Sequence, residues 1–170
     1  MDEALTGAGN VNQLLTRAVD SLRTAQARDE VLVAYARPRW AGLRLAPKLT
    51  TIARVWRLGV LLLGHDAALY ATGTTLRVSE PRHPNAQSAL AEERRELRAI
   101  ALRSGIAAGE TINVDVRDIR FEELTALTRP IARVDAGFFV QWSPKSDALA
   151  PIGTYLAERV ALLVDQPTGA

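Results

Sequence analysis

The spacing of apolar residues along the chain predicts three amphipathic helices. Apolar positions recur at helical intervals over residues 11–22, with Asn10 available to cap the first turn. The second helix is expected over residues 85–104 and is followed by Gly105, a residue typical of helix C-termini. The third is expected over residues 151–165, with a proline near its first turn.

Alternation of apolar and polar residues predicts strands between these helices. The first strand is short, and its apolar pattern also fits a continuation of the first helix. Two hairpins follow, one on each side of the second helix. The predicted strands cover residues 31–35, 51–63, 69–78, 111–117 and 130–142. Strands joined by short turns favour an α+β fold, here an antiparallel sheet of about four or five strands built from two hairpins, with about three helices packed on it.

The length and composition are typical of one globular domain. The chain has 170 residues, of which 48% are hydrophobic and 24% charged, which favours a single α+β domain over residues 11–170 after a flexible lead-in at residues 1–10. The beginning of the sequence lacks the basic and apolar order of a signal peptide, and the longest apolar run, residues 58–63, is too short to cross a bilayer. The absence of cysteine fits a reducing compartment. We therefore expect a cytoplasmic protein with no membrane partner.

Several catalytic and cofactor motifs are missing from the sequence. A phosphate-binding loop needs spaced glycines before Lys-Ser, but no glycine occurs in the five residues before Lys145-Ser146. The Gly-x-Ser-x-Gly elbow of serine hydrolases is absent, and the lack of cysteine removes thiol nucleophiles and cysteine-bound metals. The two histidines, His65 and His83, do not have the spacing of metal ligands. The sequence predicts no cofactor and no metal site.

Two residues are candidates for acid–base catalysis. His65 precedes Asp66 in a predicted turn, where a carboxylate can orient the imidazole, but a polar hairpin turn would contain the same pair. Asp115 belongs to a group of acidic residues near the end of a predicted strand. It could act as an acid, a base or a cation ligand, or it could pair with Arg117 or Arg133 across the sheet.

A basic and aromatic segment over residues 35–57, which contains no acidic residue, is the strongest local signal in the composition. Arginine contacts phosphates and aromatic rings stack on bases, so the segment could bind nucleic acid or another polyanion. The chain also carries 19 Arg, 2 Lys and 28 Ala, a bias typical of GC-rich coding, so an arginine-rich connector between core elements is the other interpretation. The candidate polyanion-binding residues are Arg37, Arg39, Trp40, Arg44 and Lys48.

A pocket at one edge of the predicted sheet is a second place for a binding site. Aromatic residues would line it and charged residues would orient the ligand, although the same aromatic residues would serve equally well as core. The candidate ligand-binding residues are Trp56, Arg57, Tyr70, Arg133 and Trp142. The sequence leaves open whether the partner is a small molecule or a protein. An apolar outer sheet face with Leu61, Leu63 and Phe139 would permit a homodimer.

Two neighbouring segments carry a resemblance to a known family. They read Trp56-Arg57-Leu58-Gly59-Val60-Leu61-Leu62-Leu63 and Leu69-Tyr70-Ala71-Thr72-Gly73, and they resemble a small family of proteins from high-GC bacteria, some of which carry the name glutaminase. The resemblance implies hydrolysis of an amide. It identifies no catalytic residue, because the chain has neither a cysteine nucleophile nor a Ser-x-x-Lys signature. We therefore expect a bacterial ligand-binding or interaction module, with an amide hydrolase and a polyanion-binding protein as the alternatives.

Overall fold

The computed structural model describes residues 8–37, 39–40, 42–80, 88–143, 145 and 147–165. These residues form two compact units, each with a hydrophobic core of its own. Unit 1 takes its described residues from Met1–Asp29, Val55–Ala71 and Arg117–Ala170, and unit 2 takes them from Glu30–Arg54 and Thr72–Val116. Neither unit is therefore a continuous stretch of the chain.

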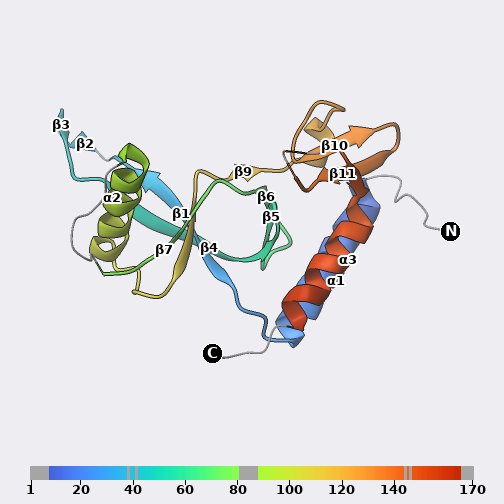
Figure 1. Cartoon of the computed structure of the whole chain (residues 1–170), viewed down its shortest axis with the longest axis horizontal. Coiled ribbons are helices and arrows are strands. Elements are labelled where there is room, and N and C mark those ends of the chain that lie inside the picture. Colours follow the sequence, from blue (N-terminus) through green and yellow to red (C-terminus); the bar gives the residue numbers. More distant parts are fainter. Residues whose placement is uncertain are drawn as a thin grey trace. The chain divides into compact units, whose positions relative to one another are not determined.

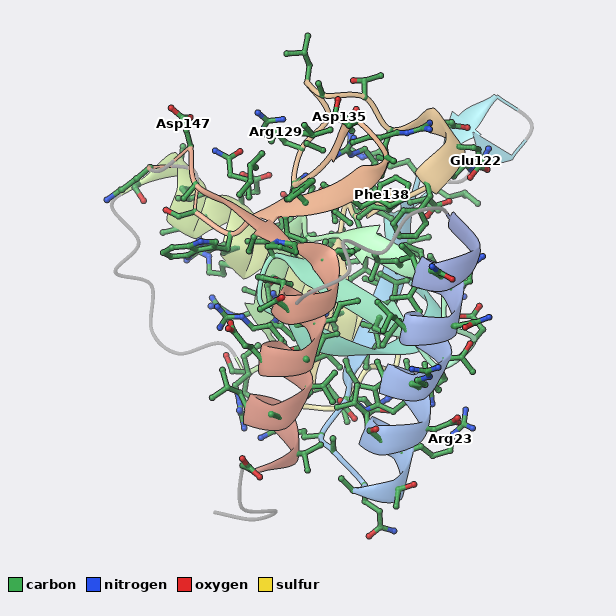
Figure 2. The ribbon with its side chains drawn as sticks, turned by 90° about the vertical axis from the view of Figure 1, so that its right-hand side faces the viewer. Arg23, Glu122, Arg129, Asp135, Phe138 and Asp147 are labelled. Atoms are coloured by element: carbon green, nitrogen blue, oxygen red, sulfur yellow. The ribbon has the colours of Figure 1, made fainter. Side chains whose placement is uncertain are left out.

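Unit 1 contains two helices that lie side by side, α1 (Ala8–Thr24) and α3 (Ile152–Val164) (Figure 1, Figure 2). A short 3-10 helix, η1 (Phe121–Glu123), also belongs to it. Its strands are the Val55–Leu58 part of β4 (Lys48–Leu58), β5 (Leu61–Gly64), β6 (Leu69–Ala71), β9 (Arg117–Asp118), β10 (Ile131–Val134), β11 (Gly137–Gln141) and β12 (Leu149–Pro151). They follow the orders β4-β5-β6-β9 and β10-β11-β12, with antiparallel neighbours throughout.

The two helices of unit 1 have the predicted periodicity and are confirmed. Their apolar stripes pack into one core with the strands of the unit. The buried helical residues are Val11, Leu15, Ala18, Val19 and Leu22 on α1 and Ile152, Tyr155 and Leu156 on α3. Helix α1 begins at Ala8, so Asn10 lies inside the helix and does not cap it. Residues 1–7 of the predicted lead-in lie outside the described residues.

A turn at Gly59 and Val60 joins β4 to β5 and is closed by a tyrosine from α3. Gly59 has a φ of +68°, a conformation that glycine adopts without strain. The Tyr155 hydroxyl accepts a hydrogen bond from the Val60 amide (3.0 Å) and donates one to the Leu58 carbonyl (2.8 Å). A Cβ atom at Gly59 would overlap this hydroxyl. The turn therefore depends on a contact between residues almost a hundred positions apart in the sequence.

Unit 2 has a mixed sheet with helix α2 (Ala89–Arg103) packed on it through Ile100 and Ala101 (Figure 1). The strands of this sheet are β7 (Thr74–Arg77), β8 (Thr111–Val114), β1 (Glu30–Ala36) and the Lys48–Arg54 part of β4, in that order. A separate two-stranded sheet pairs β2 (Arg39–Trp40) with β3 (Leu43–Arg44). The predicted strand at 31–35 and the predicted second helix are confirmed as β1 and α2. Residues 85–87, expected to open that helix, lie outside the described residues.

A buried amide ties three strands of unit 2 together. Asn113 on β8 is fully buried. Its Nδ2 donates to Glu30 Oε2 on β1 at 2.7 Å, and its Oδ1 accepts from Thr75 Oγ1 on β7 at 3.2 Å. A shift in strand register would leave this buried amide without its partners, which is costly. Asn113 therefore helps to fix the alignment of the sheet.

The α+β class is confirmed, but the predicted antiparallel sheet of about four or five strands is wrong. Seven strands form a mixed sheet in the order β7-β8-β1-β4-β5-β6-β9, and three more form a second sheet. Strand β1 runs parallel to β8, with Val31 opposite Ile112. Parallel strands need a long connection between them, so the pairing leaves no turn signal in the local sequence.

Both predicted hairpins are also wrong in their boundaries. The predicted strand 51–63 contains the turn at residues 59–60 and so includes both β4 and β5. The predicted strand 69–78 divides into β6 and β7, which belong to different units. The predicted strand 130–142 is itself a hairpin of β10 and β11, with Asp135 at φ +52° in the turn. At residues 59–60 an apolar run continues across the turn and hides it.

Two further expectations concern the surface. Within the described ranges, no helix has the length and apolar character needed to cross a membrane. Leu61 and Leu63 are fully buried in the core of unit 1. They therefore do not form the apolar outer face that was expected to permit a homodimer, and of the three residues only Phe139 is partly exposed.

Candidate ligand-binding site

A cavity of about 260 Å³ lies in unit 2, between α2 and the ends of β1 and β8. Its volume is slightly below the ~300–1,000 Å³ of typical small-molecule sites. The lining combines charged, aromatic and aliphatic side chains: Tyr35, Arg37, Glu93, Glu96, Leu97, Ile100, Val114 and Asp115. We call Glu93, Glu96 and Asp115 the cavity carboxylates. We call Leu97, Ile100 and Val114 the cavity floor, because they also pack in the core of the unit.

The parallel pairing of β1 and β8 brings two walls of the cavity together. Parallel neighbours have their carboxyl ends at the same edge of a sheet. Arg37 follows directly after the end of β1, and Asp115 follows directly after the end of β8. Ligands of open α/β sheets bind at this same edge, beyond the carboxyl ends of the strands. Arg37 and Asp115 thus lie at the corresponding edge of the parallel β1–β8 pair within this mixed sheet.

Helix α2 supplies a third wall. Four of its residues line the cavity, and their separations of three, four and seven positions place them on one face of the helix. They are Glu93, Glu96, Leu97 and Ile100. The helix is tied to the sheet at its C-terminal end, where the Ser104 hydroxyl accepts a hydrogen bond from the Leu49 amide at 3.0 Å.

Asp115 reaches the cavity from a left-handed turn. Its φ is +56°, a region that aspartate tolerates better than most residues. Gly73 lies directly against this turn: a Cβ at Gly73 would overlap the carbonyl oxygens of Val114 and Asp115 and lie 2.6 Å from the Asp115 carbonyl carbon. The position of Asp115 therefore depends on the absence of a side chain at residue 73.

Arg37 is held against Tyr35 at the wall of the cavity. Its Nε donates to the Tyr35 hydroxyl at 2.9 Å, and its guanidinium carbon lies 5.6 Å from the centre of the tyrosine ring. The hydrogen bond to Tyr35 is the main cause that raises the pKa of Arg37 above its ordinary value, and the charge of Glu96 raises it further. Arg37 is therefore a cation near neutral pH, with its direction set by Tyr35.

The cavity carboxylates, in contrast, are available to a ligand. Within the described ranges, their side chains make no hydrogen bond and no ion pair, while neighbouring Glu92 pairs with Arg95. The same part of the chain contains no group of three His, Asp or Glu residues placed to hold a metal ion. The carboxylates therefore line a cavity without converging on one point.

In unit 1, His65 pairs with Asp29 and not with the expected Asp66. His65 Nε2 lies 3.0 Å from Asp29 Oδ2, whereas Asp66 Oδ1 accepts a hydrogen bond from the Ala68 amide in its own turn. The imidazole stacks on the Trp56 ring, with centroids 4.0 Å apart and an angle of 9° between the planes. These contacts join the turn after β5 to the segment after α1, so the geometry supports a structural role.

The neighbouring contacts strengthen the same junction. Arg23, on the last turns of α1 (Figure 2), donates to the His65 carbonyl at 3.2 Å. Trp56 Nε1 donates to the Ala27 carbonyl at 3.0 Å. The indole is thereby held both by its nitrogen and by the imidazole on its face.

Replacing His65 by alanine is expected to lower the free energy of unfolding of unit 1 by about 1–2 kcal/mol. The polar contact with Asp29 at a partly exposed site contributes about 0.2–1 kcal/mol, and a stacked ring pair adds about 0.5–1.5 kcal/mol. His65→Phe keeps the stacking and should recover about half of the loss. Urea denaturation monitored by circular dichroism measures both variants. An alanine variant as stable as the wild type would contradict the structural role.

The other predicted ligand-binding residues are not gathered into one pocket. Trp56 is buried in the core of unit 1. Arg57 and Tyr70 align with Leu62 in a row across β4, β5 and β6, on the opposite face from Trp56. Burial raises the pKa of the Tyr70 hydroxyl above its ordinary value, and the charges of Asp66 and Asp118 raise it further. Arg133 on β10 is exposed, and Trp142 follows β11 with half of its surface exposed.

The predicted polyanion segment is divided between the two units. Arg37 lines the cavity, Lys48 is exposed at the start of β4, and Arg54 pairs with Glu110 at 3.2 Å. The side chains of Arg39, Trp40 and Arg44 lie outside the described residues, as does His83.

Sequence reasoning identified Arg37 and Asp115 but assigned them to different sites, and it missed their partners on α2. Glu93 and Glu96 belong to a charged run that is typical of a solvated helix face. Their helical spacing to Leu97 and Ile100 could have indicated that Glu93 and Glu96 lie on the same face of the helix as these apolar residues. A scan against protein-family models and searches of curated proteins and of solved structures found no match to the chain.

Proposed function

We propose that the protein is a ligand-binding module and that the cavity of unit 2 is its binding site. The observation that carries this proposal is the lining of the cavity, in which a guanidinium, a phenol and three carboxylates stand around an apolar floor. Small-molecule sites combine apolar surface with a few polar groups that fix the orientation of the ligand. The placement beyond the carboxyl ends of two parallel strands supports the same assignment.

A binding module fits this site better than an enzyme does. Among the described residues, the lining contains no histidine, serine, threonine or lysine, so these residues assemble no nucleophile with a neighbouring imidazole base. The pair formed by His65 and Asp29 belongs to unit 1, where its contacts connect structural elements. The amide hydrolase implied by the glutaminase name therefore has less support than ligand binding.

A thermal-unfolding screen of the purified full chain tests this proposal. The screen includes amines, organic acids, amino acids, sugars, nucleotides and short DNA and RNA. A ligand that binds only the folded state adds about 2.7 kcal/mol at a hundred times its Kd. We expect one class of small molecule to raise the Tm of the wild type but not that of Leu97→Trp, in which the indole fills the cavity. NMR amide shifts in the wild type, expected near residues 35–37, 93–100 and 114–115, locate the site even if the variant does not fold.

Two results would count against the cavity as the binding site. Ligand binding that persists in Leu97→Trp, with shifts at other residues, would place the site elsewhere. If no small molecule in the screen raises the Tm, the proposal that the cavity binds a small ligand is wrong. Stabilisation by nucleic acid alone, fading between about 50 and 200 mM salt, would support the polyanion alternative instead.

A further inference from the structure

We propose that the ligand of the unit 2 cavity is a small organic cation of the alkylammonium type. Its charged end would meet the cavity carboxylates, and its hydrocarbon part would lie on the cavity floor. This inference rests on the proposed binding function of the cavity and names the chemical class of the ligand.

The charge of the lining favours a cation. Among the described residues of the lining, three exposed carboxylates and one exposed guanidinium surround the cavity, and the guanidinium is already directed to Tyr35 by a hydrogen bond and by its position over the ring. The carboxylates make no hydrogen bond or ion pair within the described ranges, although the charge of Glu96 acts on Arg37 from a distance. Like charges gathered around low-dielectric walls attract a ligand of opposite sign. A cationic ligand therefore supplies the charge that the cavity lacks.

The form of the cavity favours an organic cation over a metal ion. A metal ion needs several oxygen ligands that converge at about 2.0–2.6 Å, and the described residues contain no such acidic group. The cavity instead has an aliphatic side formed by Leu97, Ile100 and Val114. An aliphatic surface provides no ligand atoms for a hydrated metal ion. It stabilises a ligand that buries a short hydrocarbon chain against it. The modest volume restricts that ligand to a small molecule.

Three probes of similar length separate the charge of the ligand from its shape. n-Butylammonium, n-butanol and butyrate have short unbranched hydrocarbon chains of three or four carbons and differ in the charge of the head group. Titration of the full chain with each probe, followed by NMR amide shifts, gives the affinities even when they are weak. We expect n-butylammonium to bind at least about tenfold more tightly than the other two. Its affinity should fall as salt rises, because salt screens the exposed carboxylates.

Two substitutions in the cavity should change the affinity in opposite directions. Glu96→Gln should weaken the binding of n-butylammonium about tenfold, because a charge-assisted contact becomes a neutral one. Arg37→Gln should strengthen it, because a like charge is removed from the wall. Glu158→Gln, an exposed residue on α3 in unit 1, is the matched control and should leave the affinity unchanged. Circular dichroism establishes that each variant is folded.

The outcomes distinguish this inference from the proposed function. If n-butanol or butyrate binds as well as the amine and the shifts lie in the cavity, the binding site stands and the cationic ligand is wrong. If Arg37→Gln weakens binding of the amine, the arginine holds a ligand group and the inference is also wrong. If none of the probes shifts the cavity residues while another class does so in the screen, the function stands without this ligand class. Shifts that occur only outside the cavity would overturn both.

Discussion

Replacing Gly73 by alanine is expected to lower the free energy of unfolding of unit 2 by about 3 kcal/mol or more. The added methyl group would overlap two backbone carbonyl oxygens, those of Val114 and Asp115. Backbone atoms of a paired strand cannot move aside as a flexible side chain does, so the end of β8 has to shift. Because Asp115 lines the cavity, the ligand binding that we propose for that site should be lost together with stability.

Gly105→Ala is the matched control for this prediction. Gly105 has a φ of +84° in the same unit, and a Cβ there would meet open space. It therefore carries only the conformational cost of a left-handed alanine, about 1 kcal/mol. Hydrogen exchange resolved over the peptides of unit 2 measures both variants separately from unit 1. Equal losses in the two variants would show that close approach at Gly73 is not the source of the effect.

Replacing Trp56 by alanine should lower the free energy of unfolding of unit 1 by about 3–5 kcal/mol, the usual cost of removing a large aromatic side chain from a core. Trp56 is only 2% exposed, stacks on His65 and donates to the Ala27 carbonyl. The substitution removes all three interactions and leaves a cavity. A loss of this size approaches the whole stability of many domains.

Trp142→Ala provides the comparison in the same unit. Trp142 is 50% exposed, so its removal should cost about 1 kcal/mol at most. Urea denaturation monitored by circular dichroism and by hydrogen exchange in α1 and α3 gives both values. If Trp142→Ala lowers the free energy of unfolding as much as Trp56→Ala does, the burial of the indole ring does not determine the size of the loss.

The elements that were predicted correctly are those whose signal is local. Helices α1 and α3 bury one stripe of apolar residues each, and the stripe is visible within a single window of sequence. The turn between β4 and β5 is different. Its residues, Gly59 and Val60, continue an apolar run, and the hydrogen bonds that close it come from Tyr155. Because Tyr155 is so far away in the sequence, the residues around the turn do not indicate that it closes the turn.

The candidate site was only half predictable for the same reason. Arg37 and Asp115 were recognised as unusual charged residues, but they line the same cavity because β1 and β8 are parallel neighbours. Parallel pairing is a property of the whole fold and not of either strand. The carboxylates of α2 lie among charges that resemble any solvated helix face. His65 was recognised as well, yet its partner Asp29 follows α1, whereas the neighbouring Asp66 bonds to its own turn.

The division of the chain between the units has a consequence for folding during synthesis. All segments of unit 2 have been made once Val116 is joined to the chain, whereas unit 1 still lacks strands β9–β12 and helix α3. At about 5–20 residues per second, the ribosome needs roughly 2–10 s more to reach the end of α3. Throughout that interval the apolar stripe of α1, made first of all, has no partner helix. The nascent chain therefore completes unit 2 first and exposes the core of unit 1 for longest.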